Sequence, residues 1–197
     1  MFFFFFDKSK LSDDKSHNRP SEQIRSDFGL EVANDQVLRS SKRQRAALTH
    51  YLGEKNCSVE EILGRKLFVY RTNGKKFILL HKAISYLGNP HPIFKKRIQM
   101  PSSWQEFCND AIAAKIDYDI RFVGVYHYQD NVIFVDFAKD TYLQHGLHNS
   151  SAHVYTNDLY QAVRNGVFHR EGPVWQSHLF SKGERLCGLF GRNKNRR

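Results

Sequence analysis

The sequence lacks the features that mark secreted and membrane-spanning proteins. It has only three cysteines in 197 residues, Cys57, Cys108 and Cys187, and they lie far apart. An odd number of widely spaced cysteines argues against a disulfide framework and indicates a reducing compartment, so we expect a cytoplasmic protein. No apolar run reaches the roughly 18 residues of a membrane span, so we expect no membrane partner. The five consecutive phenylalanines near the start are not followed by a small-residue cleavage site, which argues against a signal peptide.

Several common catalytic signatures are also missing. The chain has no P-loop, no glycine-rich dinucleotide-binding pattern, no HExxH and no GxSxG sequence. Each of these motifs marks a well-defined chemistry, so the sequence gives no sign of a P-loop NTPase, a Rossmann oxidoreductase, a zincin or an α/β-hydrolase.

Acidic residues are scarce relative to basic ones. The chain has 30 Lys and Arg against 20 Asp and Glu, a formal net charge of +10. Several basic residues stand in clusters, which is typical of surfaces that neutralise nucleic-acid phosphates. We therefore predict a nucleic-acid partner, DNA more strongly than RNA, while a solvated basic surface remains the alternative. The predicted contacts in these clusters are Lys42, Arg43, Arg45, Lys95, Lys96 and Arg97.

Composition divides the chain into three parts. Residues 1–34 are polar and charged after the phenylalanine run, so we expect a loosely ordered N-terminal segment. Residues 35–185 alternate apolar stretches with turn signals and predict a single domain, with a subdomain break near 88–92, where glycine and proline cluster. Residues 186–197 predict a basic C-terminal tail.

Two β-hairpins and several helices are expected within the domain. The first hairpin spans 66–80 around Asn73-Gly74, a pair that suits a tight type I′ turn, and the second spans 120–138. Helical periodicity and capping signals, including the Ser58–Glu61 spacing, predict the helices. This mixture indicates an α+β fold, with a mixed or antiparallel sheet built from two hairpins and flanking helices. The helices are expected at 35–52, 58–64, 81–87, 102–114 and 150–164.

A carboxylate interrupts the most apolar predicted strand. Asp136 ends that strand and Asp119 begins the previous one, so antiparallel pairing would bring them together. With Lys139, this arrangement resembles the PD-(D/E)XK restriction-endonuclease-like superfamily. The resemblance implies that Asp119 and Asp136 hold Mg²⁺ and that Lys139 is the catalytic lysine. However, the spacing here is acid-x-x-Lys rather than acid-x-Lys, which places the two groups on opposite strand faces unless a bulge intervenes. The alternative is that Asp136 and Asp140 cap a strand end or pair with Arg121.

A His/Asn/Ser-rich stretch follows the second hairpin. At a helix start, Asn149, Ser150 and Ser151 would bind a phosphate, and His148 and His153 would act on it as acid, base or charge stabiliser. The spacing of the histidines does not match the common zinc motifs. Simple helix capping with exposed histidines is the alternative.

One face of the helix expected at 150–164 is polar throughout. Its members recur every three or four residues, so they share a face, and such side chains can read base edges. A solvated face is the alternative. The residues are His153, Asn157, Gln161 and Arg164.

Three functions are consistent with these patterns. The leading hypothesis is a small Mg²⁺-dependent endonuclease of restriction, phage or mobile-element type, which would be a homodimer if its cutting is palindromic. The second is a metal-independent RNase or toxin that uses His148 and His153. The third is a non-enzymatic DNA- or RNA-binding regulator.

Overall fold

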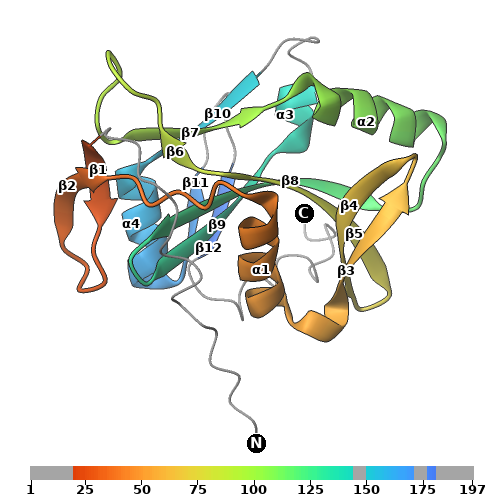
Figure 1. The fold of residues 1–197 in the computed structure, drawn as a ribbon, viewed down its shortest axis with the longest axis horizontal. Coiled ribbons are helices and arrows are strands. Elements are labelled where there is room, and N and C mark those ends of the chain that lie inside the picture. The colour runs from red at the N-terminus through yellow and green to blue at the C-terminus, as the bar shows by residue number, and fades with distance from the viewer. Residues whose placement is uncertain (1–19, 144–149, 171–176, 181–197) are drawn as a thin grey trace, which may run out of the picture.

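The structure of the chain is a computed structural model, and it describes residues 20–143, 150–170 and 177–180 (Figure 1). These residues form both helices and strands, with one 3-10 turn at Glu54–Asn56. No helix in the described part of the chain is both long and apolar enough to cross a membrane. In chain order the elements are β1 (Pro20–Ile24), β2 (Leu30–Asn34), α1 (Ser41–Leu52), β3 (Cys57–Ile62), β4 (Arg65–Thr72), β5 (Lys75–Ala83), β6 (Ser85–Tyr86), β7 (Lys95–Met100), α2 (Ser102–Ala113), β8 (Asp119–Tyr128), β9 (Asn131–Phe137), α3 (Lys139–Leu143), β10 (Ser150–Tyr155), α4 (Thr156–Asn165), β11 (Val167–Arg170) and β12 (Ser177–Phe180).

The strands form three sheets. The largest has the order β11-β12-β9-β8-β5-β4-β3, a smaller one has the order β10-β7-β6, and β1 pairs with β2. All neighbouring strands of the large sheet run antiparallel except β5 and β8, which are parallel. The large sheet is therefore mixed, and the α+β fold with hairpins and flanking helices is confirmed.

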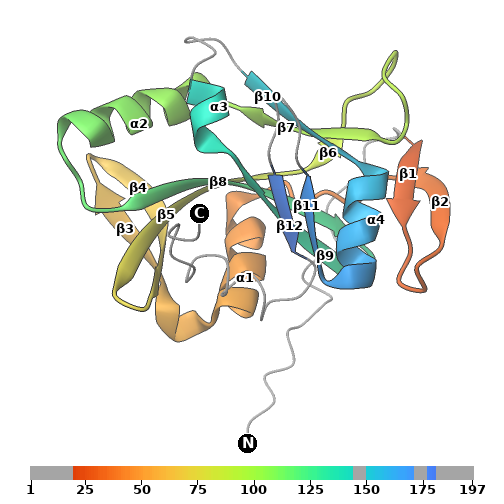
Figure 2. The ribbon, with the colours of Figure 1, turned by 180° about the vertical axis from the view of Figure 1, so that it is seen from behind.

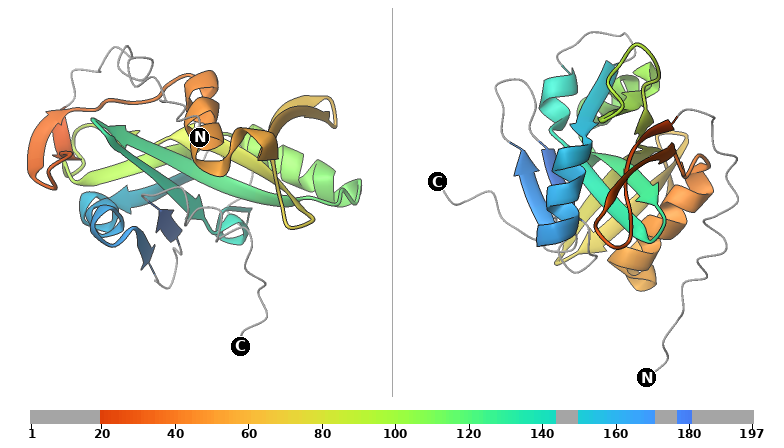
Figure 3. Two further views of the ribbon diagram at one scale, coloured as in Figure 1. Left: turned by 90° about the horizontal axis from the view of Figure 1, so that it is seen from below. Right: turned by 90° about the vertical axis from the view of Figure 1, so that its left-hand side faces the viewer.

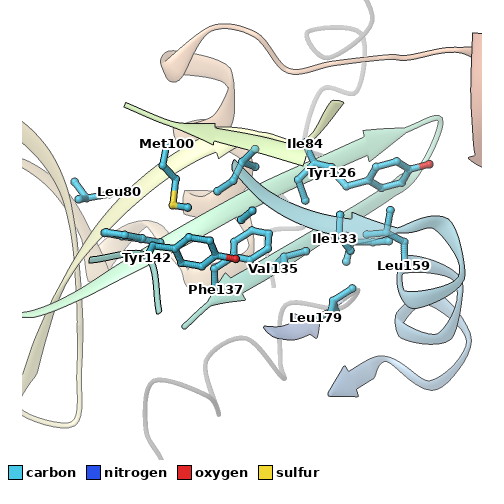
Figure 4. Close-up of a cluster of buried hydrophobic side chains, with 14 of the residues drawn as sticks. Leu80, Ile84, Met100, Tyr126, Ile133, Val135, Phe137, Tyr142, Leu159 and Leu179 are labelled. Carbon is cyan, nitrogen blue, oxygen red and sulfur yellow. The ribbon is translucent and has the colours of Figure 1, made fainter. Parts of the chain in front are cut away.

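The large sheet is apolar on both faces, and each face has its own core. On one face Leu48 and Leu52 of α1 pack against the sheet. On the other face the small sheet, α2 and α4 cover the sheet, and Figure 4 shows part of this second core. Figures 2 and 3 show α1 and α4 on opposite sides of β8 and β9. The small sheet is thus held on the face away from α1.

Local sequence signals located both predicted hairpins. The β4–β5 turn contains Asn73 and Gly74, with φ of 49° and 74°, the positive values that a type I′ turn requires. The β8–β9 hairpin turns at 129–130, as expected. The helix predicted at 102–114 is also confirmed as α2, and its Ile112 is 70% exposed.

Three segments expected to be helical form strands instead. Ser58 does not cap a helix, because its strand β3 pairs with β4 and its hydroxyl accepts a hydrogen bond from Arg71 (2.8 Å). Residues 81–83 continue β5, because that strand pairs with β8 as far as Ala83. Residues 150–155 form β10, which pairs with β7. In each case pairing with a distant strand outweighed a local helix signal.

Two helices start later than their periodicity predicted. Helix α1 begins at Ser41, because the Ser40 hydroxyl accepts a hydrogen bond from the backbone N–H of Arg43 (3.1 Å) and so caps it. Helix α4 begins at Thr156 and ends at Asn165, close to the predicted end at 164, and its C-cap Gly166 has a φ of 76°. Glycine adopts this left-handed conformation more readily than any other residue.

The segment assigned to a loosely ordered N-terminus contains a hairpin. Residues 20–34 form β1 and β2, and Ile24 is fully buried in the core beneath the small sheet. The sequence did not predict these strands, because the segment has low hydrophobicity. Polar side chains make many of the contacts that hold the hairpin against the rest of the fold. Residues 1–19 and the tail at 186–197 lie outside the described residues.

Candidate nucleic-acid interface

The pairing of β7 with β10 joins two segments that sequence analysis singled out separately. In this antiparallel pair Arg97 lies opposite His153, and Gln99 lies opposite Ser151. One face of the two strands carries only polar or aromatic side chains that are exposed or half-buried. We call it the polar sheet face, and it consists of Lys95, Arg97, Gln99, Ser151, His153 and Tyr155.

Strand alternation explains why this face is polar. Side chains of successive strand residues point to opposite sides of a sheet. On β7, Lys96, Ile98 and Met100 are therefore buried while their neighbours are not. On β10, Ala152 and Val154 are fully buried in the same way.

Positive charge dominates the polar sheet face. Two basic side chains, Lys95 and Arg97, lie on this face, and the sequences of β6, β7 and β10 contain no Asp or Glu. Arg97 donates a hydrogen bond to the Ser151 hydroxyl (3.3 Å). Partial burial, reinforced by the charges of Lys95 and Arg97, lowers the pKa of His153 to about 4. His153 is therefore neutral at pH 7, and the face has the charge and donors to bind an anion.

Lys96 cannot contact a nucleic acid in this fold, which corrects its assignment as a binding residue. Its side chain is completely buried, and its ammonium group donates to Asp35 (3.1 Å) and to Ser21 (2.8 Å). Burial lowers its pKa, and the nearby carboxylate of Asp35 opposes that shift. Lys96 instead ties β7 to the N-terminal hairpin.

The remaining basic predictions lie on α1. Lys42 is exposed, whereas Arg43 and Arg45 are half-buried. They are accessible to a phosphate in different degrees, and their role in binding stays a prediction.

The polar helix face predicted to begin at His153 is shorter than expected. His153 belongs to β10, so only Asn157, Gln161 and Arg164 share the helix, where Asn157 and Arg164 are exposed. Arg164 donates to the Tyr160 hydroxyl (3.3 Å). A role for these side chains in reading bases stays a prediction.

The predicted phosphate site at a helix start does not form as expected. Ser150 and Ser151 lie in β10 rather than at a helix N-terminus. The His148 and Asn149 predictions fall outside the described residues. Ser151 lies beside Arg97 through strand pairing, and its role in binding a phosphate stays a prediction.

Arg121 links the two carboxylates of the predicted acid pair. It donates from Nη2 to Asp119 (2.8 Å) and from Nη1 to Asp136 (3.1 Å). Asp136 is buried and Asp119 is exposed, and both carboxylates raise the pKa of Arg121 against the effect of its burial. Both carboxylates therefore contact Arg121, and the pairing of Asp136 with Arg121 that was the alternative is present. Their role as a metal-binding pair stays a prediction.

The surroundings of this acid pair do not fit a Mg²⁺ site of the restriction-endonuclease type. A guanidinium already supplies positive charge between the carboxylates. No group of three or more His, Cys, Asp or Glu side chains that could hold a metal occurs among the described residues. Lys139 begins α3, whose Tyr142 packs in the core on the opposite sheet face from Asp136, and the Lys139 charge acts there on buried Cys108. Strand β9 ends at Phe137, so Lys139 is not on the strand that carries Asp136.

Sequence reasoning missed Gln99 and Tyr155 as members of the interface. The signal was available in Lys95–Met100, where charged or polar residues alternate with apolar ones after Lys96. Read as a strand, this segment places Lys95, Arg97 and Gln99 on one side.

Comparison with known proteins identifies one family. The family model described as Methylase-associated X1 matches residues 75–187, which include the whole polar sheet face. The chain has no match among curated proteins and none among solved structures.

Proposed function

The chain belongs to the Methylase-associated X1 family, and from this premise we propose that it binds DNA as the partner of a methylase. The family description gives the chain a restriction–modification related role. The substrate of such a system is DNA, so DNA is favoured over RNA as the nucleic acid. DNA binding is the main proposal, and phosphodiester cleavage is a second candidate function.

The observation that carries the proposal is the polar sheet face. Lys95 and Arg97 present positive charge on one strand, Ser151 and His153 add hydrogen-bonding groups on the next, and no acidic residue of these strands opposes them. Arginine and lysine that neutralise phosphates supply most of the sequence-independent affinity for DNA. Gln99 adds an amide that can pair with a base edge.

Salt-dependent binding tests this proposal. We expect the double substitution Lys95→Ala and Arg97→Ala to weaken binding to duplex DNA and to reduce the slope of log affinity against log salt by about 2, one for each lost phosphate contact. The measurement is fluorescence anisotropy over a range of NaCl concentrations. Lys66→Ala is the matched control, because Lys66 is exposed on β4 outside this face. An unchanged slope in the double variant would rule out the face as the interface.

Phosphodiester cleavage is the second candidate function. The observation that favours it is that Asp119 and Asp136 both accept hydrogen bonds from Arg121, which keeps the two carboxylates near each other. Under this hypothesis Mg²⁺ is the cofactor, although Arg121 and the position of Lys139 make the fit incomplete. A metal-independent RNase that uses His153 is the other form of this candidate.

A single assay separates these forms. Duplex DNA and structured RNA are incubated with the protein in Mg²⁺ and, in parallel, in EDTA. If the acid pair is catalytic, DNA is cut only in Mg²⁺, and Asp136→Asn abolishes cutting while binding remains. RNA cutting that persists in EDTA and is lost in His153→Ala would assign the chemistry to the histidine. Intact substrates in every arm would leave DNA binding as the function.

A further inference from the structure

A pocket of about 280 Å³ opens at the edge of the small sheet, beside β6. The segment between β2 and α1 forms one wall, and Figure 1 shows this segment crossing in front of the sheet. Strands β6 and β7 form the other wall. We call it the β6 pocket, and the lining residues used here are Asp35, Val37, Arg39, Tyr86, Arg97 and Gln99.

The β6 pocket and the polar sheet face share two side chains. Arg97 and Gln99 line the pocket and also belong to the face. Since β6 is the edge strand of the small sheet, a ligand that lies on the face can pass directly into the pocket. The pocket is thus continuous with the surface that we propose binds DNA.

The chemistry of the pocket suits one nucleotide. Arg39 and Arg97 stand on opposite walls and supply two guanidinium groups, the side chains best suited to bidentate contacts with phosphate. Val37 offers apolar surface to the face of a base. A volume near 280 Å³ lies at the small end of the range for ligand sites, which is about 300–1,000 Å³.

Asp35 supplies a fixed acceptor at the base of the pocket. One of its oxygens accepts from Ser21 (2.8 Å), Gln23 (2.6 Å) and Lys96 (3.1 Å), which locks the carboxylate in place. Its other oxygen accepts from the backbone N–H of Tyr86 (2.6 Å). Each carboxylate oxygen has two lone pairs, and this second oxygen uses one of them for the hydrogen bond from Tyr86, so it can also accept from the amino group of a base.

We propose that the β6 pocket binds a single nucleotide turned out of DNA held on the polar sheet face, with its phosphates between Arg39 and Arg97 and an amino-bearing base against Asp35 and Gln99. This inference rests on the proposed DNA binding and goes beyond it by assigning a substrate unit and a site. A free nucleotide has the same chemistry, so the test includes both sources. Extrusion is easiest where a base lacks its partner.

The first arm of the test uses a DNA duplex with 2-aminopurine opposite an abasic site. The fluorescence of 2-aminopurine rises when the base leaves the stack. We expect this rise when the full chain binds, and we expect Val37→Trp, which fills the pocket, to bind DNA within about threefold of wild type without the rise. Val32→Trp is the matched control, since Val32 is 61% exposed on β2 and does not line the pocket.

The second arm titrates the chain with single deoxynucleoside monophosphates by calorimetry. We expect dAMP or dCMP to bind about tenfold more tightly than dTMP, the effect of about one paired amino group. Arg39→Ala removes a phosphate contact without filling the pocket, so it tests the site even if Val37→Trp does not fold. Its DNA complex is expected to lose the fluorescence rise.

The outcomes distinguish the two proposals. DNA binding without a fluorescence rise in the wild-type chain would overturn the pocket proposal and leave the proposed function standing. A rise that survives in Val37→Trp would also overturn it. If the chain binds no DNA, both the proposed function and extrusion from DNA fail.

Discussion

At the scale of single residues, burial sets the charge of one histidine that has no role in the interface. His81 lies on β5, and its Nδ1 donates to the amide oxygen of Gln44 (2.9 Å). Gln44 in turn donates to the backbone carbonyl of Leu38 (2.6 Å). Burial lowers the pKa of His81 to about 4, and the charge of Arg45 adds to this effect. His81 therefore joins β5 to α1 in its neutral form.

We predict that His81 makes the fold sensitive to acid. Its pKa of about 4 in the folded chain lies below the ordinary 6.5, so the unfolded chain binds more protons between these pH values. The free energy of unfolding should then decrease as the pH falls from 6.5 to 4, by up to about 3 kcal/mol from this residue. The measurement is urea unfolding at a series of pH values.

His81→Gln should keep the contact with Gln44 and flatten this dependence. Some slope will remain, because the pKa of His153 is lowered to a similar value. His169→Gln is the control, since His169 is exposed on β11. A slope that is equally steep in His81→Gln and wild type would contradict the assignment.

At the scale of elements, a buried polar cluster fastens the N-terminal hairpin to the small sheet. Asp35 follows β2 and accepts hydrogen bonds from Ser21 and Gln23 of β1 and from Lys96 of β7. Gln23 also accepts from the Tyr126 hydroxyl of β8 (3.0 Å). The cluster therefore joins the N-terminal hairpin to β7 and β8, which are far from it in the sequence.

Breaking the buried ion pair should be strongly destabilising. We expect Asp35→Ala to reduce the free energy of unfolding by about 3–5 kcal/mol, because the Lys96 ammonium would stay buried without its carboxylate. Lys96→Met should cost less, since Asp35 keeps its bonds to Ser21, Gln23 and the Tyr86 backbone. Urea unfolding of both variants and of the double variant completes the cycle.

The double variant gives the sharper result. If the loss in Asp35→Ala comes from an unpaired buried charge, adding Lys96→Met should restore part of the stability. A double variant that loses the sum of the two single effects would show instead that the residues do not interact.

Elements stabilised by local signals could be predicted from the sequence, and those stabilised by distant pairing could not. Asn73-Gly74 fixes its own turn, and the stripe of Phe107, Cys108 and Ala111 gives α2 a buried side. By contrast, Ser58 carries a helix-capping signal yet lies in a strand. Residues 150–155 carried a similar signal and pair with β7. Nothing within residues 150–155 themselves identifies β7 as the strand with which they pair.

The same distinction applies to the candidate site. Composition indicated Lys95, Arg97, Ser151 and His153 individually, because basic and polar residues are recognisable in any context. Their convergence depends on the β7–β10 register, in which residues more than 50 positions apart become neighbours. Sequence reasoning also could not separate Lys96 from its two neighbours without knowing that this segment is a strand.

At the scale of the whole molecule, the family match and the fold have different boundaries. The matched residues 75–187 include β5, β7, β8, β9 and β10, and so contain the polar sheet face. They exclude α1, which covers one face of the large sheet, and β3 and β4, which extend that sheet. They also exclude Asp35, the carboxylate that neutralises Lys96.

We therefore predict that the matched region does not fold alone. A fragment of residues 75–197 would uncover Phe77, Leu79 and Phe134, which are at most 1% exposed in the full chain because α1 and β4 cover them. Burying a side chain of this size contributes roughly 1.5–3 kcal/mol, so the loss of three is comparable to the entire stability of a typical domain.

Circular dichroism during heating should show a cooperative transition for the full chain and none for the fragment. The fragment should also bind the dye ANS, which reports exposed apolar surface. Cooperative unfolding of the fragment near the transition temperature of the full chain would mean that α1 and the N-terminal hairpin are accessory to the fold, and that the face residues on β7 and β10 are positioned by the matched region alone.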